Sequence, residues 1–165
     1  MLTKSMFRRT GLVLTLGLSL FAGSAGVANA GPTAKSGAAA CPVSGQRFQV
    51  GNGTQVYLVG PDNILYAIAN ETVYFKLWNT WDGITRWPTS TIPSCFTSAY
   101  LWTNAGLRKG RNEPQVYIWD QRESPNGAYR WITSEAVFNK YSFAPNKIVV
   151  SEYGPPISST NNWDQ

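Results

Sequence analysis

The sequence predicts an α+β fold in which two tandem ββα(β) repeat units pack as one small domain. The segment Gln55-Val56-Tyr57-Leu58 returns sixty residues later as Gln115-Val116-Tyr117-Ile118, and residues 68–77 return as 132–141, at an offset of sixty-four. Such self-similarity is typical of repeated structural units. Within each copy, short β-rich runs end at Gly, Pro and Asp turn signals, and apolar residues at helical spacing follow.

A leader typical of secreted proteins precedes the repeats. Lys4, Arg8 and Arg9 form a positive start, residues 12–22 are apolar and uncharged, and Ala28-Asn29-Ala30 offers small residues at a cleavage site. These features predict a signal peptide over 1–30, cleaved after Ala30, and a secreted protein. A membrane anchor is the alternative, but the apolar core is shorter than the roughly 20 residues that span a bilayer. Twin-arginine export is a weaker alternative than general secretion.

Removal of the leader changes the charge of the protein. The whole chain carries a net charge of +5, whereas the mature part keeps 11 basic and nine acidic residues, a net charge of +2. A basic domain would indicate nucleic-acid binding, but most of this excess leaves with the leader. The remaining cluster of Arg108, Lys109 and Arg111 is typical of a solvated turn. The sequence therefore predicts no nucleic-acid partner, and no membrane partner after signal removal.

The mature chain divides into three parts. Residues 31–40 are small and featureless and are expected to be disordered. Residues 41–154 form the duplicated globular domain, with repeats at about 48–95 and 107–153. Residues 155–165 are expected to form a flexible tail, from which Trp163 could dock on the domain.

The elements of the first copy are expected in the order strand, strand, helix. Val56 to Val59 and Ile64 to Ile68 form a hairpin across a turn at Pro61-Asp62-Asn63. Asn70 is a suitable N-cap, and Glu71 follows in the first turn, where the helix dipole favours negative charge.

The second copy repeats this order, and each unit is expected to continue into a short strand after its helix. Residues 116–119 and 128–132 form the hairpin, and its turn, Pro125-Asn126-Gly127, absorbs the four extra residues. Ser134 is the N-cap of a helix of about two turns. Residues 148–150 form the third strand.

The second copy resembles a short repeat of secreted and cell-surface bacterial proteins, often appended to enzymes directed at the cell wall. The matching residues are Val116-Tyr117-Ile118, Arg130-Trp131-Ile132, Ser134, Phe138 and Ile148-Val149-Val150. The first copy departs from the pattern, with Tyr66-Ala67-Ile68 in place of the Arg-Trp-Ile segment. The resemblance covers about residues 48–153 and implies an accessory or binding module of poorly known ligand, without catalytic activity.

Two cysteines, Cys41 and Cys95, occur in the chain. An even number in an exported protein favours a disulfide between them. A cysteine nucleophile is the alternative, but it would lack its usual partner because the chain contains no histidine.

The sequence offers little to support catalysis. Without histidine, triads of the Ser-His-Asp and Cys-His types and most zinc sites are excluded. No phosphate-cradling loop or dinucleotide motif occurs, so no cofactor and no metal are expected. A carboxylate-dependent glycoside hydrolase, which needs two acidic residues beside a cleft, is the remaining enzymatic alternative. The candidates are Asp62, Glu71, Asp82, Glu113, Asp120, Glu123 and Glu135, of which Asp120 is the least explained by local structure.

Aromatic residues are the feature of the sequence that indicates a binding function. The mature chain holds all seven tryptophans and all eight tyrosines. Trp102, Trp119 and Trp131 fall on strands, where core packing is expected. A loop marked by Gly and Pro gathers a candidate ligand-binding set, since exposed aromatic rings can stack on the apolar faces of sugars: Trp78, Trp81, Asp82, Arg86 and Trp87.

These observations predict a secreted, non-catalytic binding or accessory protein that recognises a cell-envelope polysaccharide or a surface partner through exposed aromatic residues. Its expected partners are a cell-wall glycan or an extracellular protein. A small secreted inhibitor of an extracellular hydrolase, acting through a loop such as Gly83 to Pro93, is the alternative.

Overall fold

The computed structural model describes residues 40–123, 126–156 and 158–164. All of them belong to one compact unit, Gly37–Gln165. The predicted signal peptide, and residues 31–39 of the segment expected to be disordered, lie outside the described residues. Over the described ranges, no helix is long and apolar enough to cross a bilayer.

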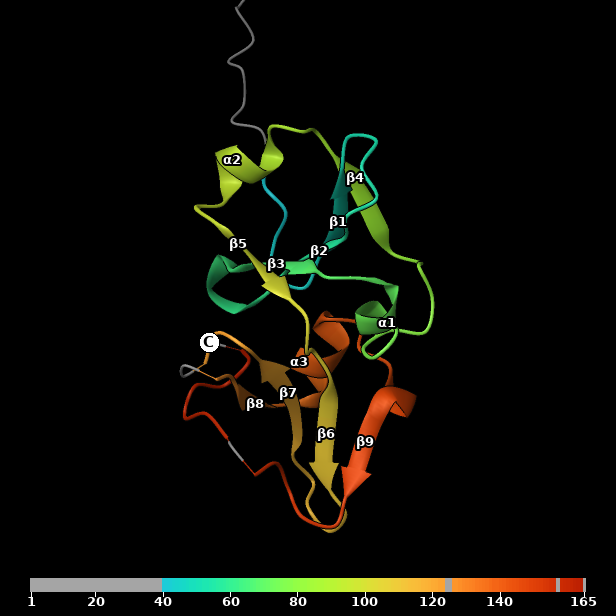
Figure 1. The fold of residues 1–165 in the computed structure, drawn as a ribbon, viewed down its shortest axis with the longest axis vertical. Coiled ribbons are helices and arrows are strands. Elements are labelled where there is room, and N and C mark those ends of the chain that lie inside the picture. Colours follow the sequence, from blue (N-terminus) through green and yellow to red (C-terminus); the bar gives the residue numbers. More distant parts are fainter. Residues whose placement is uncertain (1–39, 124–125, 157, 165) are drawn as a thin grey trace, which may run out of the picture. The chain divides into compact units, whose positions relative to one another are not determined.

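The fold is α+β, as predicted, with two β-sheets and a few short helices (Figure 1). The elements follow in the order β1 (Arg47–Val50), β2 (Tyr57–Val59), η1 (Pro61–Asn63), β3 (Leu65–Ile68), α1 (Glu71–Tyr74), β4 (Ile84–Trp87), α2 (Thr91–Cys95), β5 (Ala99–Trp102), β6 (Leu107–Gly110), β7 (Val116–Asp120), β8 (Ala128–Ile132), α3 (Glu135–Lys140), η2 (Pro145–Lys147) and β9 (Ile148–Ser151).

The first sheet has the strand order β4-β1-β2-β3-β5. Strands β1, β2 and β3 form an antiparallel meander. The two outer strands, β4 and β5, pair parallel to β1 and β3, respectively.

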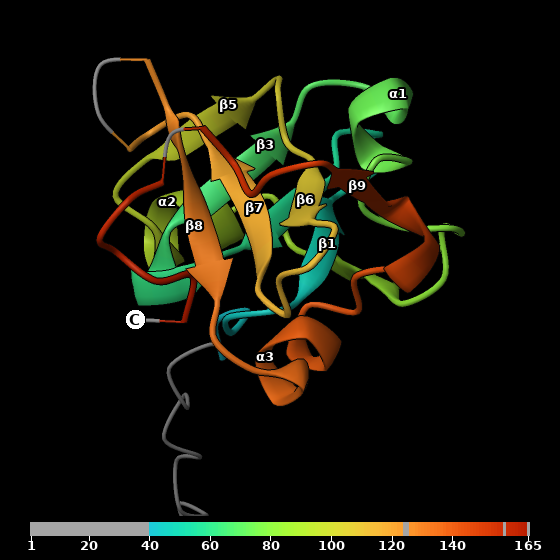
Figure 2. The same cartoon turned by 90° about the horizontal axis from the view of Figure 1, so that it is seen from below.

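The second sheet, in the order β8-β7-β6-β9, has the same connections as the first four strands of the first sheet (Figure 2). Strands β6, β7 and β8 form the antiparallel meander, and β9 pairs parallel to β6. Arg47 faces Leu58 in the first sheet, and Leu107 faces Ile118 in the second, so the register repeats at an offset of sixty. An origin of the two halves by duplication stays a prediction.

Both hairpins lie where the sequence predicts them, but several elements were not predicted. Strands β1 and β6 precede the hairpins. We call the half of the fold built from β1 to β4 the first unit and the half built from β6 to β9 the second unit; α2 and β5 follow the first unit. The sequence of β1 hides its burial because Arg47 points inward and is 7% exposed. Its guanidinium lies over the ring of Trp78, 4.9 Å from the centroid. This cation–π contact stabilises a charged side chain at a buried strand position.

Helices α1 and α3 each begin at a residue whose side chain caps the helix, as the sequence predicts. Asn70 Oδ1 accepts a hydrogen bond from the backbone N–H of Val73 at 3.0 Å. Ser134 Oγ accepts one from Val137 at 3.2 Å. α1, with four residues, is shorter than the two turns expected, whereas α3, with six residues, is close to two turns.

Replacement of Asn70 with alanine is expected to lower the free energy of unfolding by about 1 kcal/mol, because it removes the N-cap acceptor of α1. Urea denaturation followed by tryptophan fluorescence measures the change. The matched control is Asn70→Asp, which retains an acceptor and should stay close to the wild type. An alanine variant as stable as the aspartate variant would contradict the capping role.

The main core joins the two sheets through aromatic side chains. Trp102 of β5 and Trp163 of the C-terminal segment stack at 5.5 Å, and both are fully buried. The segment also pairs with β8, through a bridge between Tyr129 and Ser158 and a hydrogen bond from the Trp163 N–H to the Trp131 carbonyl. Trp163 thus docks on the domain, because its apolar ring and the open edge of β8 give the segment partners.

A buried polar network lies beside this core. Asp120 is fully buried and pairs with Arg130 at 3.1 Å. Its carboxylate also accepts hydrogen bonds from the Tyr66 hydroxyl at 2.7 Å and from the Arg122 backbone N–H at 3.0 Å. Burial raises the pKa of Tyr66 well above its usual value, and the Asp120 charge raises it further. Tyr66 therefore stays a neutral donor to the carboxylate.

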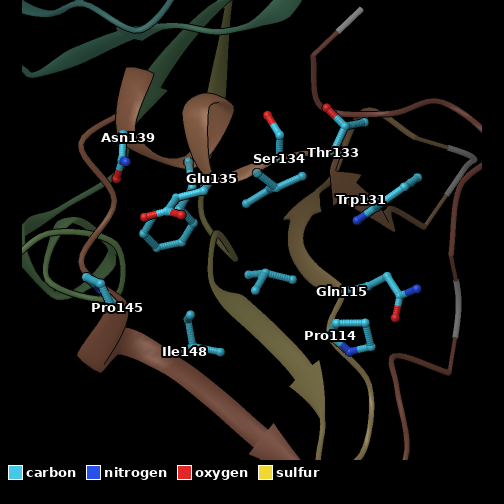
Figure 3. Close-up of a pocket in the computed structure, with 12 residues that line it drawn as sticks. Pro114, Gln115, Trp131, Thr133, Ser134, Glu135, Asn139, Pro145 and Ile148 are labelled. Atoms are coloured by element: carbon cyan, nitrogen blue, oxygen red, sulfur yellow. The ribbon is translucent and has the colours of Figure 1, made fainter.

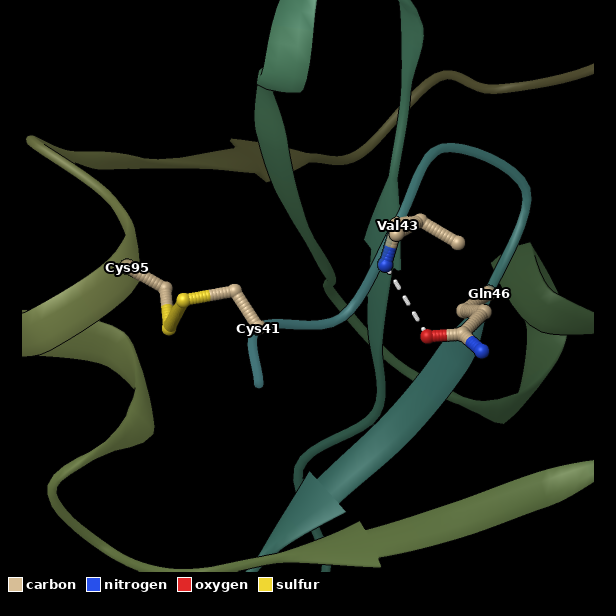
Figure 4. Close-up of a disulfide and its surroundings, with 4 residues drawn as sticks. All are labelled: Cys41, Val43, Gln46 and Cys95. Carbon is tan, nitrogen blue, oxygen red and sulfur yellow. Dashed lines mark hydrogen bonds between the residues drawn. A yellow bond between two sulfur atoms is a disulfide. The ribbon is translucent and has the colours of Figure 1, made fainter. Parts of the chain in front are cut away.

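The predicted disulfide is present between Cys41 and Cys95 (Figure 4). It fastens the first described residues to the end of α2. Nearby, the backbone N–H of Val43 donates to the side chain of Gln46 at 2.9 Å, which turns the chain toward β1.

Candidate functional site

The register of the second sheet aligns four side chains in a row on its outer face. Trp131 lies opposite Tyr117, Tyr117 opposite Arg108, and Arg108 opposite Val149. Because successive side chains of a strand point to opposite faces, these residues face away from the core, whereas Ile118 and its cross-strand partners face inward. The row runs across all four strands.

Two more aromatic residues share this outer face. Trp119 and Tyr129 lie opposite each other, two positions along from the row, with their rings edge to face at 5.1 Å. Gly127 permits this packing, because its φ is +83° and an added Cβ would lie 2.4 Å from the Trp119 ring. We call the outward residues Tyr117, Trp119, Tyr129 and Trp131 the aromatic face.

The aromatic face is open to solvent. Trp131 is 37% exposed, and Tyr117, Trp119 and Tyr129 are half-buried. Trp119 and Trp131 were expected in the core with Trp102, but only Trp102 lies there. The difference follows from strand alternation: on β7 and β8 the inward positions are taken by smaller or charged residues such as Ile118 and Arg130.

A cavity of about 480 Å³ opens beside Trp131 (Figure 3). Trp131 and Gln115 lie on one side of it, and Pro145 and Ile148 on the other, with Glu135 between them. Its lining is mainly apolar, and its polar groups are amides, hydroxyls and one carboxylate. The lining residues are Pro114, Gln115, Val116, Trp131, Ile132, Thr133, Ser134, Glu135, Phe138, Asn139, Pro145 and Ile148.

A second cavity, of about 410 Å³, occupies the corresponding place in the first unit. Trp81 lines it and stacks on Tyr74 with the ring centroids 4.0 Å apart. The side-chain amide of Gln55 donates hydrogen bonds to the backbone carbonyls of Val56 and Ile68. Its lining residues are Thr54, Gln55, Val56, Ile68, Ala69, Asn70, Glu71, Tyr74 and Trp81.

The five residues that the sequence nominates as a ligand site do not form one surface. Trp78 is 1% exposed and donates its indole N–H to the Tyr141 carbonyl, so it belongs to the core. Trp81 is 45% exposed and lines the first-unit cavity. Trp87 is half-buried and packs beside the core around Phe48.

The two charged members of that set support local structure. Arg86 donates to the backbone carbonyls of Gly51 and Gly53 at 2.8 and 3.2 Å. The carboxylate of Asp82 accepts from the Thr80 hydroxyl, and its backbone carbonyl accepts from Arg47 at 2.7 Å. Burial lowers the pKa of Arg47, and its contact with Tyr74 partly offsets that effect.

The carboxylates give no arrangement suited to metal binding. Over the described ranges, no three His, Cys, Asp or Glu side chains gather into a group that could hold a metal ion. Asp120, the acidic residue least explained by the sequence, is fully buried and held by Tyr66 and Arg130. Its role is therefore accounted for by packing.

The aromatic face was missed by sequence reasoning, although the sequence contains a signal for it. Tyr117 and Trp119 are two residues apart on one strand, and Tyr129 and Trp131 on the next. Such spacing puts each pair on one face of a sheet. The apolar character of these rings favoured the core interpretation instead.

Comparison of the chain with protein-family models, with curated proteins and with solved structures gave no match.

Proposed function

We propose that this chain is a secreted, non-catalytic binding protein that recognises a cell-envelope polysaccharide through the aromatic face and the adjoining Trp131 cavity. The observation that carries the proposal is the row from Trp131 through Tyr117 to Arg108 on an uncovered sheet face. Exposed aromatic surface of this kind usually marks an interaction site. The Cys41–Cys95 disulfide is compatible with an oxidising, extracellular compartment.

The chemistry of the surface suits a sugar chain. Indole and phenol rings can stack on the apolar faces of sugar rings. The indole N–H of Trp119 is buried, so this residue would contribute its ring face alone. Around Trp131, the cavity supplies the side chains of Gln115, Glu135 and Asn139, which can hydrogen-bond to sugar hydroxyls. An apolar floor with a few placed polar groups is typical of ligand sites.

The inhibitor alternative depends on a protruding loop, and no observation favours it. The segment from Gly83 to Pro93 forms β4 and the start of α2. β4 pairs with β1 along its whole length, and Arg86 holds the neighbouring turn at Gly51. We therefore favour glycan binding.

Replacement of Trp131 with alanine is expected to weaken glycan binding about tenfold, which corresponds to about 1.4 kcal/mol. The measurement is retention of the purified secreted chain on insoluble peptidoglycan, chitin and cellulose, with soluble fragments as competitors. The matched control is Trp81→Ala, which removes the same kind of side chain, with similar exposure, from the first unit.

The control should bind like the wild type. Loss of retention in Trp81→Ala but not in Trp131→Ala would move the site to the first unit and contradict the proposal. Glycan binding is refuted if none of the three polymers retains the wild-type protein and soluble fragments leave its tryptophan fluorescence unchanged.

A further inference from the structure

A third cavity, of about 520 Å³, gathers positive charge. Lys76, Arg108 and Lys147 line it, together with Phe75 and Tyr129. No aspartate or glutamate is among its lining residues, which also include Asn104, Ala105, Gly106, Leu107, Asn146 and Val149. We call it the basic groove.

Among the described residues, none of the three cations of the basic groove forms an ion pair with a carboxylate. Within the described ranges, ion pairs form between other residues: Arg111 with Glu152, Arg130 with Asp120 and Glu123, and Lys140 with Asp164. The positive charges of Lys76, Arg108 and Lys147 are therefore not neutralised by paired carboxylates. A cleft lined by one sign of charge concentrates the field and attracts ions of the opposite sign.

Three separate parts of the chain build the groove. Lys76 follows α1, Arg108 lies on β6, and Lys147 ends η2. The amide of Asn79 donates to the side chain of Asn146 at 2.9 Å, which ties the segment beside Lys147 to the first unit. The fold thus brings these like charges together and holds them there.

The groove also has room and free donors. Gly106 lines it, and an added Cβ at this position would have no heavy atom within 4 Å, so the floor is open there. The Arg108 guanidinium lies over the Tyr129 ring, 5.9 Å from its centroid, which orients the group without using its N–H donors. Guanidinium and ammonium groups so placed are suited to oxyanions.

We propose that the basic groove is a second binding site, which takes a phosphate or carboxylate group of an acidic glycan chain. Arg108 belongs both to the groove and to the row that leads to Trp131. A chain lying along that row would place sugar rings on the aromatic face and an anionic group between Lys76, Arg108 and Lys147. The choice of a glycan rests on the proposed function, whereas the anion site does not.

The groove is tested with the double variant Lys76→Gln/Lys147→Gln of the secreted chain, which leaves Arg108 and the rest of the row unchanged. The matched control, Lys109→Gln/Lys140→Gln, removes the same net charge from outside the groove. Calorimetric titration measures the Kd for a phosphomannan and for polygalacturonate, and neutral chitin fragments report on the aromatic face. Inorganic phosphate and single-stranded DNA complete the set of probes.

At least one acidic polymer is expected to bind about tenfold more weakly to the groove variant, while the control stays within about twofold of the wild type. Whichever polymer responds identifies the anionic group. Neutral fragments should bind both variants alike, so failure of the aromatic face is distinguished from failure of the groove. Equal weakening in the control, binding of inorganic phosphate alone, or equally tight binding of single-stranded DNA would each overturn the assignment.

Discussion

Replacement of Asp120 with alanine is expected to lower the free energy of unfolding by about 3–5 kcal/mol, the usual cost of leaving a buried charge without its partner. Arg130 is 3% exposed, and besides its ion pair with Asp120 it donates to the Asn162 carbonyl of the C-terminal segment. The substitution also removes the acceptor of the Tyr66 hydroxyl. Guanidinium denaturation followed by tryptophan fluorescence measures the loss.

A double variant separates the charge effect from the loss of volume. Asp120→Leu/Arg130→Leu removes both charges and should recover much of the stability, because apolar pairs of similar volume often replace buried ion pairs without net loss. The Tyr66→Phe variant should lose only about 1 kcal/mol. A loss below about 1 kcal/mol in Asp120→Ala would show that the network contributes little to the fold.

Removal of the disulfide, by Cys41→Ala/Cys95→Ala, is expected to lower the free energy of unfolding by about 4 kcal/mol in the chain-entropy model. The two cysteines are 54 residues apart, so the bridge closes a long loop of the unfolded chain. It also fixes α2 beside the small core formed by Phe48 and Phe96, whose rings stack at 6.2 Å. Urea denaturation with and without a thiol reductant gives the difference.

The double variant is its own control for reduction. Its denaturation midpoint should not respond to the reductant, whereas that of the wild type should fall to a similar value. An unchanged wild-type midpoint under full reduction, checked by thiol titration, would contradict a stabilising role for the bridge.

Local chemistry made much of the fold predictable. The hairpins follow from β-rich runs between turn residues, and Asn70 and Ser134 cap helices because their side chains accept backbone hydrogen bonds. Strand β6 was missed because its Leu-Arg-Lys-Gly sequence has little β character of its own. Pairing with β7 on one side and β9 on the other stabilises it, and sequence propensity does not include such tertiary pairing.

The binding surface was harder to predict for a related reason. Gly and Pro mark a loop around Trp81 and therefore predict exposed side chains there, but neighbouring Trp78 packs inward against Tyr74 and Phe143. Whether a strand tryptophan faces the core or the solvent depends on which side of its sheet is covered. For Trp131 that is decided by the packing of the second sheet, which no local pattern encodes.

The most direct test of glycan binding at the aromatic face uses the indole N–H signals of the seven tryptophans. Each signal in a ¹H–¹⁵N correlation spectrum can be assigned with single substitutions and then followed during titration with soluble chitin or peptidoglycan fragments. We expect the Trp131 signal to shift most and Trp119 to shift with it, whereas the buried Trp78, Trp102 and Trp163 stay in place. Shifts confined to Trp81 and Trp87, with Trp131 unmoved at saturating glycan, would contradict the account.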